Sequence, residues 1–470
     1  MLNNLTILII RTLNSNKFFF FFLFFFLLIA ILNIKEVFYI NYLLIIMHLI
    51  IAFLSCMIIL KKEFDGLLVK SFGVFSLFAF GLMPILEILT NTIYWLGGDI
   101  DLFSRLRANL IVTIFIILFM IGFKVNFRQI TKLQLLNKPK LIFKKKEQLL
   151  FLLIIISSFI YLLYLYKWQI KEFFFWSVYG PDIDIDTKAG FLIINFFLKP
   201  FIFNLGLYLF FFKGPYKFLG TLGLFIVIIS VFPTGIPRFL ALALYLPLIL
   251  HWFFVSLKFK ENKLNILNLL FPNILIFGVI FIFPTLNLFR FYADHLFVVD
   301  NFNYLKIISV QAILDGHFDS YQMLTRGLNV GEINFGYGFI SSLLFFIPRS
   351  IWQDKGVGSG YDISYLSDLN LPNVSAPLIL ELYLNFWYLG VLFGGLTLGF
   401  LLSMIDKFFI KITSYKISLA WIIYFQSVGY FFLILRGSFL AAFAYFLSWI
   451  LTWLVIIQLH FLIRYFITKQ

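Results

Sequence analysis

Apolar runs separated by short polar segments make up most of this chain. Twelve of these runs approach or reach the length of about 20 apolar residues that an α-helix needs to cross a bilayer. The runs lie at 18–34, 37–60, 67–89, 108–123, 149–165, 191–212, 218–232, 239–257, 264–285, 376–405, 417–435 and 439–460. This pattern predicts an all-α polytopic integral membrane protein with about 12 transmembrane helices.

One long, mostly polar segment interrupts the apolar pattern at 286–372. It divides the chain into 1–285, with transmembrane helices 1–9, the loop itself, and 373–470, with transmembrane helices 10–12. Within the loop, 335–348 is apolar but too short to span and favours an interfacial or re-entrant helix. The mixed segment 304–314 is suited to lying flat on a membrane surface. We therefore expect one large loop of short interfacial helices that caps one side of the membrane.

The first apolar run resembles a signal peptide only in part. It follows the basic residues Arg11 and Lys17, but it lacks a small-residue cleavage site, and a second run follows almost at once. A cleaved signal peptide needs that cleavage site. We expect this run to remain as a transmembrane helix.

The composition agrees with a membrane protein. The chain is 62% hydrophobic and 13% charged, against roughly 45–50% and 25% in soluble domains. The single cysteine, Cys56, cannot form a disulfide within the chain, and the five histidines are scattered. No HExxH motif, no Cys/His cluster and no phosphate-cradling Gly-Lys-Ser/Thr motif occurs. The sequence therefore predicts neither a metal nor a cofactor.

The formal charge of +15 is concentrated on one side of the predicted membrane. If the N-terminus is cytoplasmic, every short inner loop is basic, as the positive-inside rule requires. The 124–147 segment alone carries Lys124, Arg128, Lys132, Lys138, Lys140, Lys144, Lys145 and Lys146. This charge would face anionic membrane lipid, so it does not indicate a nucleic-acid partner. Both termini are then cytoplasmic, and the loop at 286–372 is periplasmic.

The second half of the chain contains motifs that resemble a known family. They include FPTGIPRF, GHFDSY, the run GYGFISSLLFFIPRSIWQDKGVGSGYDIS, the start SAPLILELYLNFWYLG of the tenth predicted helix, and LRGSF. Over roughly 230–440 the chain resembles the O-antigen and capsule repeat-unit polymerases (Wzy-type). Two positions depart from that pattern: Trp387 stands where glycine is expected, and Ser438 stands where an acidic residue often follows Arg-Gly.

The resemblance implies an integral-membrane glycosyltransferase on a GT-C-like scaffold in the bacterial inner membrane. Such an enzyme polymerises undecaprenyl-pyrophosphate-linked oligosaccharide repeat units at the outer face, for lipopolysaccharide or other polysaccharide biosynthesis. The growing glycan is transferred to an acceptor repeat unit, and the lipid pyrophosphate is released. A chain-length regulator and a flippase are the protein partners that this resemblance implies.

A pyrophosphate leaving group needs cationic donors on the outer side of the membrane. Arginine suits this role because its planar fork donates two parallel hydrogen bonds. The candidate pyrophosphate-binding residues are Arg238, Arg290, Arg349, Lys355 and Arg436, all on the predicted outer side. The alternative for each arginine is a side chain that reaches lipid phosphates without a catalytic role.

Glu381 is the first candidate for the general base that an acceptor hydroxyl needs. It lies about one turn into a predicted span, where ionisable groups are costly and usually functional. Glu381, Asn385 and Tyr388 are spaced i, i+4, i+7 and share a helix face. Asn385, Tyr388 and Tyr383 are the candidates for orienting the substrate. The alternative for Glu381 is a structural ion pair with Arg349 or Arg436.

Asp319, in GHFDSY, is the second candidate base. Glu87 and Lys199 also lie within predicted spans, and the sequence assigns them no partner. Gly390 with Gly394, and then Gly395 with Gly399, have the spacing of small residues at close helix contacts. This spacing indicates helix packing.

Two other functions remain open at this stage. An O-antigen ligase also joins a lipid-linked glycan to an acceptor on the outer side. A lipid-linked oligosaccharide flippase or transporter would move the same lipid without chemistry. Transporters often show repeated halves, whereas the large loop here occurs only in the second half.

Overall fold

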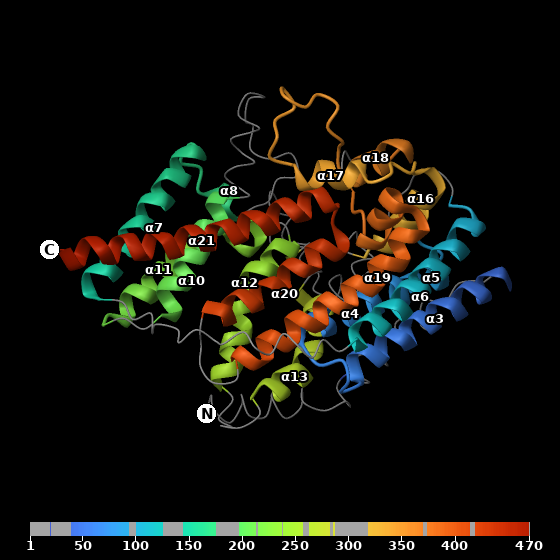
Figure 1. Cartoon of the computed structure of the whole chain (residues 1–470), viewed down its shortest axis with the longest axis horizontal. Coiled ribbons are helices and arrows are strands. Elements are labelled where there is room, and N and C mark those ends of the chain that lie inside the picture. The colour runs from blue at the N-terminus through green and yellow to red at the C-terminus, as the bar shows by residue number, and fades with distance from the viewer. Residues whose placement is uncertain are drawn as a thin grey trace, which may run out of the picture.

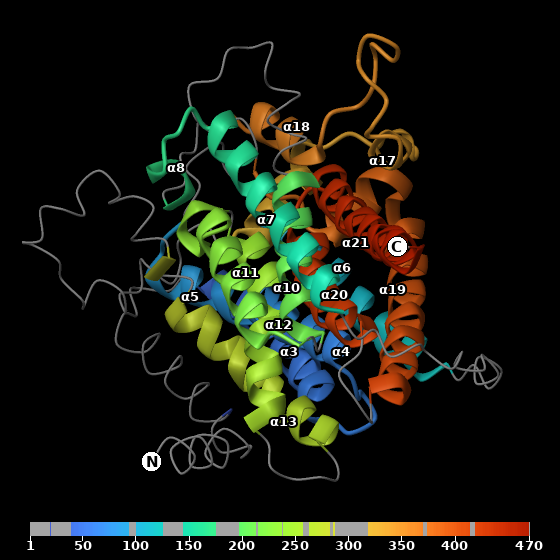
Figure 2. The ribbon, with the colours of Figure 1, turned by 90° about the vertical axis from the view of Figure 1, so that its left-hand side faces the viewer.

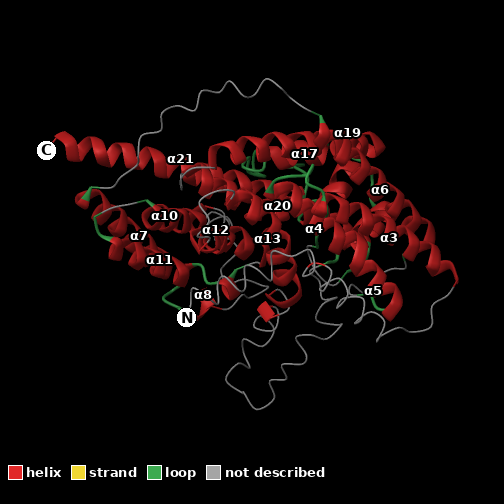
Figure 3. Ribbon diagram, turned by 90° about the horizontal axis from the view of Figure 1, so that it is seen from below, coloured by secondary structure: helices red, strands yellow, loops and turns green. Residues whose placement is uncertain are grey.

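The computed structural model describes residues 19, 39–93, 100–125, 144–174, 197–212, 215–236, 238–256, 263–282, 285–286, 318–369, 374–413 and 419–469. Within them the chain is helical and contains no strand (Figure 3). The α-helical class expected from the apolar pattern is therefore confirmed for the described part of the chain.

The described helices occur in the following order along the chain. The first part contains α3 (Tyr39–Leu60), α4 (Leu67–Ser76), the π-helix η1 (Leu77–Leu82), α5 (Met83–Thr90), α6 (Leu102–Lys124), α7 (Lys145–Leu165), α8 (Lys171–Phe174), α10 (Lys199–Phe211), α11 (Lys217–Ser230), the 3₁₀ turn η5 (Pro233–Gly235), α12 (Arg238–Ser256), α13 (Lys263–Phe277) and the π-helix η6 (Gly278–Ile282). The second part contains α16 (Ser320–Val330), α17 (Tyr337–Leu343), α18 (Ser359–Leu366), α19 (Leu378–Thr413), α20 (Leu419–Arg436) and α21 (Phe439–Lys469).

Eight segments of the described chain are long and apolar enough to cross a membrane. They are Asn41–Leu60, Leu67–Thr90, Leu102–Lys124, Lys145–Leu165, Lys217–Gly235, Leu378–Phe409, Leu419–Arg436 and Phe439–Ile467. Three further predicted spans correspond to the shorter apolar helices Lys199–Phe211, Arg238–Trp252 and Leu270–Ile282. The first predicted span lies outside the described residues apart from Phe19. These apolar helices indicate a membrane-embedded protein.

The arrangement of the described helices is shown from two directions in Figures 1 and 2, and two packed cores hold these helices together. The first core is formed mainly by α3 to α6, α16, α19 and α20. The second core is formed mainly by α7, α10, α11, α12 and the middle of α21. Helices α12 and α20 contribute to both cores and lie between them in Figure 1.

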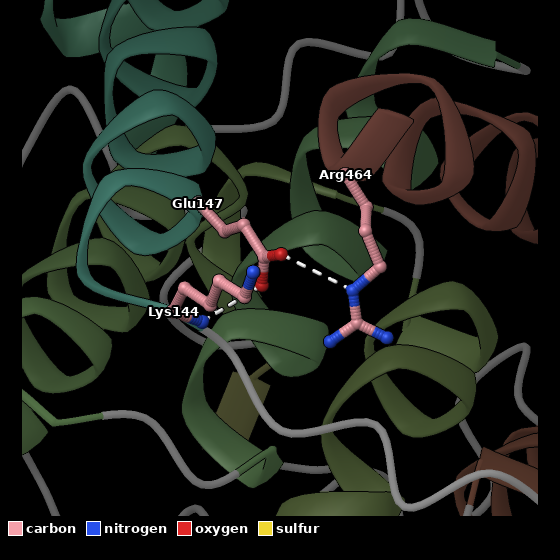
Figure 4. A network of polar contacts seen from close by, with 3 residues as sticks. All are labelled: Lys144, Glu147 and Arg464. Carbon is pink, nitrogen blue, oxygen red and sulfur yellow. Dashed lines mark hydrogen bonds and ion pairs between the residues drawn. The ribbon is translucent and has the colours of Figure 1, made fainter. Parts of the chain in front are cut away.

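Two ion pairs join segments that the sequence predicts near the inner side. Lys124 pairs with Glu63 at 3.0 Å. The buried carboxylate of Glu147 accepts a hydrogen bond from the backbone N–H of Lys144 at 2.7 Å and pairs with Arg464 at 3.2 Å (Figure 4). A carboxylate beside a helix N-terminus interacts favourably with the helix dipole. The first turn of α7 is therefore fixed to the end of α21.

Asp406 makes a second contact of this kind. Its two oxygens accept the backbone N–H groups of Leu68 at 3.2 Å and Val69 at 3.0 Å, in the first turn of α4. The hydroxyl of Tyr424 donates to the same carboxylate at 2.6 Å. Because free backbone N–H groups at a buried helix end are costly, Asp406 stabilises the entry of α4 between α19 and α20.

One part of the bundle carries the segment that the sequence predicts as a large loop. We use the term cap for residues 318–369, with helices α16, α17 and α18, which are seen at the upper right of Figure 1. Helix α16 is buried from Ser320 to Leu328 and packs against α6 and α19. This part of the loop is therefore core structure and not an exposed connection. The apolar residues Phe335, Ile340 and Phe346, in and around α17, are largely exposed.

Helix α19 bends sharply at Trp387, whose backbone adopts φ 55° and ψ −147°. This conformation is costly for any residue that has a Cβ atom. It falls at the position where the family resemblance leads us to expect glycine. After the bend, Gly390 lies so close to the carbonyl oxygen of Leu382 that a Cβ atom there would be 2.1 Å from it.

The glycine pairs of α19 separate into two kinds of contact. Gly395 and Gly399 face the backbone carbonyls of Phe115 and Phe119 on α6, where a Cβ would lie 2.9 Å and 2.1 Å away. These two glycines allow the close helix packing that their spacing indicates. Gly390, in contrast, allows the bend within α19 itself.

Candidate functional site

Glu381 lies near the start of α19 and is buried, with 6% of its surface exposed. One carboxylate oxygen, Oε2, accepts the hydroxyl of Ser359 at 2.8 Å. The other, Oε1, accepts the backbone N–H of Phe439 at 2.8 Å. Ser359 begins α18 and Phe439 begins α21, so one carboxylate serves two helix N-termini, where negative charge is favoured. Glu381 thus joins the cap to the last transmembrane helix.

Asp319 lies immediately before α16 and pairs with Arg436 at the end of α20, with 3.0 Å between Oδ1 and Nη2. The hydroxyl of Ser375 donates to the same oxygen at 2.7 Å. The Asp319 side chain is almost completely buried, at 1% exposed, and that of Arg436 is 20% exposed. The guanidinium of Arg436 also lies over the ring of Phe239, 4.9 Å from its centroid.

The short turn between α20 and α21 connects these two carboxylates. Arg436, at its start, contacts Asp319, and Phe439, at its end, contacts Glu381. The loop before α18 packs on the same turn, since a Cβ at Gly358 would lie 2.6 Å from Oγ of Ser438. The structure therefore brings the two candidate bases and one candidate cation to a single turn. Arg436 forms its ion pair with Asp319, and Glu381 forms no ion pair with any described residue.

Asn385, expected to orient the substrate, holds the N-terminus of α17 instead. Its side-chain oxygen accepts the backbone N–H of Phe339 at 2.7 Å. Its amide nitrogen donates to the carbonyl of Glu381 at 2.8 Å. Asn385 is 2% exposed, so both of its contacts are internal. Its observed contacts place it as a support for the cap, next to Glu381.

Lys355 and Arg349 differ in how free they are to bind a ligand. The ammonium of Lys355 donates to the carbonyls of Phe345 and Ile347, both at 2.8 Å. Burial and the nearby charge of Arg349 lower the pKa of Lys355. Arg349 is exposed, and its one described hydrogen bond is a long one, 3.4 Å, to the carbonyl of Gly356. Of these two candidates, Arg349 keeps its guanidinium open to a ligand, and Lys355 stabilises the turn after α17.

The remaining two cations of the predicted set differ in position. Arg238 is half-buried at the start of α12, next to Phe239, which packs under Arg436. The contact of Phe239 with Arg436 places the start of α12 near the turn between α20 and α21. Arg290 lies outside the described residues.

Tyr383 and Tyr388, also expected to contact substrate, bind Arg107 of α6. The guanidinium of Arg107 donates to the hydroxyl of Tyr388 at 2.8 Å and to the hydroxyl of Tyr383. Arg107 was not a candidate from the sequence. The available signal was the pair of arginines, Arg105 and Arg107, immediately before a span on the predicted outer side.

Glu87, which the sequence could not assign, lines a small polar pocket near the cap. The pocket measures about 60 Å³ and is bounded by Arg105, Tyr321, Gln322 and Thr325 among others. Ligand pockets are usually about 300–1,000 Å³, so this one is too small for a sugar. The other unassigned charge, Lys199, is buried with its ammonium 5.2 Å from the ring of Tyr166.

The two carboxylates share a chemically useful feature. Each accepts a hydrogen bond from a serine hydroxyl, Ser359 for Glu381 and Ser375 for Asp319. A carboxylate that binds a serine hydroxyl has the geometry to bind a substrate hydroxyl in its place, which is the first requirement for a general base. The described residues contain no group of His, Cys, Asp and Glu placed to hold a metal ion. The two carboxylates and Arg436 can supply proton transfer and charge stabilisation.

Comparisons with known proteins do not identify a family for this chain. No family model, no curated protein and no solved structure matches this chain. The contacts described above and the motif resemblance therefore carry the functional inference.

Proposed function

We propose that this protein is an integral-membrane glycosyltransferase that polymerises undecaprenyl-pyrophosphate-linked oligosaccharide repeat units at the outer face of the bacterial inner membrane. The observation that carries the proposal is the convergence of Glu381, Asp319 and Arg436 at the turn between α20 and α21, beneath the cap. Buried ionisable groups at the end of membrane helices are costly and usually mark a site. The motif resemblance supplies the reaction class.

The proposed step is a displacement at the anomeric carbon of the donor glycan. The acceptor hydroxyl attacks this carbon and loses its proton to a carboxylate. The bond from the carbon to the pyrophosphate oxygen breaks, and the lipid pyrophosphate leaves with the electron pair. One new glycosidic bond forms for each pyrophosphate released, so no oxidant or reductant is needed.

Glu381 is the proposed base. The hydroxyl of Ser359 occupies its Oε2 atom, so an acceptor hydroxyl reaches this oxygen by replacing the serine. Asp319 is the alternative base, but its Oδ1 atom already accepts both Arg436 and Ser375. Because the negative charge of Asp319 is already paired with Arg436, we favour a structural role for Asp319, in which it keeps Arg436 in place.

Arg349 is the proposed pyrophosphate-binding group in the cap. Its guanidinium is exposed, and its fork is suited to two oxygens of one phosphate. Arg436 adds positive charge deeper in the site. Since the leaving group gains negative charge as the bond breaks, cations at fixed positions stabilise the transition state more than the ground state.

The decisive experiment uses the purified protein in detergent with lipid-linked repeat units as the only substrate. The wild-type protein should produce a ladder of longer lipid-linked glycans, and Arg349→Lys should lower the rate because lysine lacks the fork. A wild-type protein that gives no ladder contradicts the proposal.

Deletion of the protein in cells distinguishes the two rival functions. A polymerase predicts single repeat units on the final acceptor and no ladder. Long chains that persist on the lipid carrier would instead indicate a ligase. Repeat units that accumulate on the cytoplasmic leaflet would indicate a flippase.

A further inference from the structure

Arg107 is held in a corner formed by two tyrosines. Its Nε atom donates to the hydroxyl of Tyr388 at 2.8 Å, and its Nη2 atom donates to the hydroxyl of Tyr383. Its Cζ atom lies 5.0 Å from the centroid of the Tyr383 ring and 5.4 Å from that of Tyr388. The two rings meet nearly edge to face, at 76°. Four contacts therefore fix the position and the plane of one guanidinium.

The bend in α19 creates this corner. In a straight α-helix, residues five apart point in directions about 140° different, because each residue turns the chain by about 100°. Tyr383 and Tyr388 would then not reach the same guanidinium. The non-helical conformation of Trp387, between them, brings both hydroxyls to Arg107. The backbone strain at Trp387 thus has a structural result at this position, as is typical of functional sites.

Several donors of this group have no acceptor within the described part of the chain. The Nε–Nη2 edge of Arg107 is used by the tyrosines, and Nη1 makes no described hydrogen bond. Both tyrosine hydroxyls accept from Arg107, and neither donates to another described residue. No described carboxylate pairs with Arg107. A fixed guanidinium and two hydroxyl protons fit a ligand that carries several oxygen acceptors and negative charge.

The surroundings show what kind of molecule carries that charge. Phe103, one turn before Arg107 on α6, is 72% exposed, and Trp387 and Leu389 are 53% and 60% exposed. Phe103 lies in the first turn of α6, and Trp387 and Leu389 lie at the bend of α19, on either side of Tyr388, which contacts Arg107. These side chains therefore surround the end of an apolar helix, where a lipid places its headgroup beside its chains. A free anion would gain nothing from this apolar border, whereas a lipid would bury its chains against it.

We propose that Arg107, Tyr383 and Tyr388 form a binding site for the phosphate group of a lipid. The Nη1–Nη2 end of the guanidinium binds two phosphate oxygens, and the tyrosine hydroxyls donate to the same group. The phosphate belongs to a prenyl pyrophosphate or to an ordinary phospholipid, and both present the same oxygen atoms. The inference concerns binding alone, so it does not depend on the proposed glycosyl transfer.

The experiment measures lipid binding to the purified full-length protein in detergent. The probes are undecaprenyl pyrophosphate, dioleoyl phosphatidylglycerol and inorganic phosphate. The variants are Arg107→Gln, Arg107→Lys and the pair Tyr383→Phe with Tyr388→Phe, which keeps both rings and removes both hydroxyls. The control is Lys124→Gln, at the other end of α6, where the lysine pairs with the exposed Glu63.

The arginine variants should weaken binding of the preferred lipid at least tenfold for glutamine and several-fold for lysine, which keeps the charge but loses the fork. The double tyrosine variant should also weaken it, and the control should bind like wild type. An affinity of Arg107→Gln within twofold of wild type for both lipids overturns the proposal. Inorganic phosphate that binds as tightly as the lipids overturns the assignment to a lipid. Because Tyr388 is partly exposed, Tyr388→Phe alone gives a readout that does not depend on the fold.

The two lipid probes identify the source of the phosphate. At least tenfold preference for the prenyl pyrophosphate assigns the site to the lipid-linked substrate. Equal affinities assign it to membrane phospholipid. Failure of this site and failure of the proposed function are distinguishable. A protein that binds lipid through Arg107 but makes no polymer supports the site and contradicts the proposed function. A protein that makes polymer but does not bind lipid through Arg107 supports the function and contradicts the site.

Discussion

Asp319 and Arg436 form a buried ion pair in which each charge lies at the helix end that favours it. Asp319 precedes the N-terminus of α16, and Arg436 is in the last turn of α20, with 3.0 Å between Oδ1 and Nη2. Negative charge is favoured at a helix N-terminus and positive charge at a C-terminus. The pair therefore fixes the cap to the transmembrane bundle and sets the position of the turn that leads to α21.

Removal of one partner of this pair should destabilise the protein strongly. Asp319→Asn leaves Arg436 without its counter-charge in a largely buried position, which typically costs roughly 3–5 kcal/mol. The double variant Asp319→Asn with Arg436→Met should recover part of the loss, because it leaves no unpaired charge. Thermal unfolding in detergent of the wild type, the two single variants Asp319→Asn and Arg436→Met, and the double variant measures the coupling between the two residues. Additive losses would show that the two residues do not depend on each other.

The role of Glu381 as a base can be separated from its role in holding helix ends. Glu381→Gln keeps the size of the side chain and removes the base, so polymerisation should fall by roughly a hundredfold or more. Ser359→Ala removes the hydrogen bond to Oε2 and keeps the carboxylate, so it should retain far more activity. Both proteins are compared with wild type for rate and for thermal stability. Equal losses of rate in the two variants would mark Glu381 as structural and leave Asp319 as the base to test.

Replacement of Trp387 by glycine, the residue that the motif resemblance leads us to expect there, should stabilise the protein. Its φ of 55° and ψ of −147° are strained for tryptophan, and its side chain is 53% exposed. Trp387→Gly should therefore raise the thermal stability, by about 1 kcal/mol or more, because glycine adopts this conformation without steric cost. Trp387→Ala is the matched control, since it removes the side chain and keeps the strain. A Trp387→Gly protein that is no more stable than Trp387→Ala would show that the backbone at this position is not strained.

The orientation of the bundle can be tested with two single cysteines in a Cys56→Ala background. Tyr365 in the cap and Lys145 at the start of α7 are both exposed in the structure. In intact spheroplasts, Tyr365→Cys should react with a membrane-impermeant thiol reagent, and Lys145→Cys should react only after lysis. The opposite labelling pattern would reverse the predicted orientation.

The sequence by itself determined the helical class and most of the helix positions. Apolar runs of this length leave no alternative to helices in a membrane, because every backbone group must then be bonded within its own segment. The polar interruption at 286–372 contains the cap, and the motifs singled out Glu381, Asp319 and Arg436. The spacing of small residues on α19 also indicated a close helix contact, since Gly395 and Gly399 face α6.

Only the tertiary structure decided which of these side chains meet. Arg436 pairs with Asp319 and not with Glu381, and the partner of Tyr383 and Tyr388 is Arg107 on another helix. Helical periodicity places residues on a face, but contacts between distant segments depend on helix tilt and on bends such as that at Trp387. These are set by packing against neighbours, so no local pattern in the sequence encodes them.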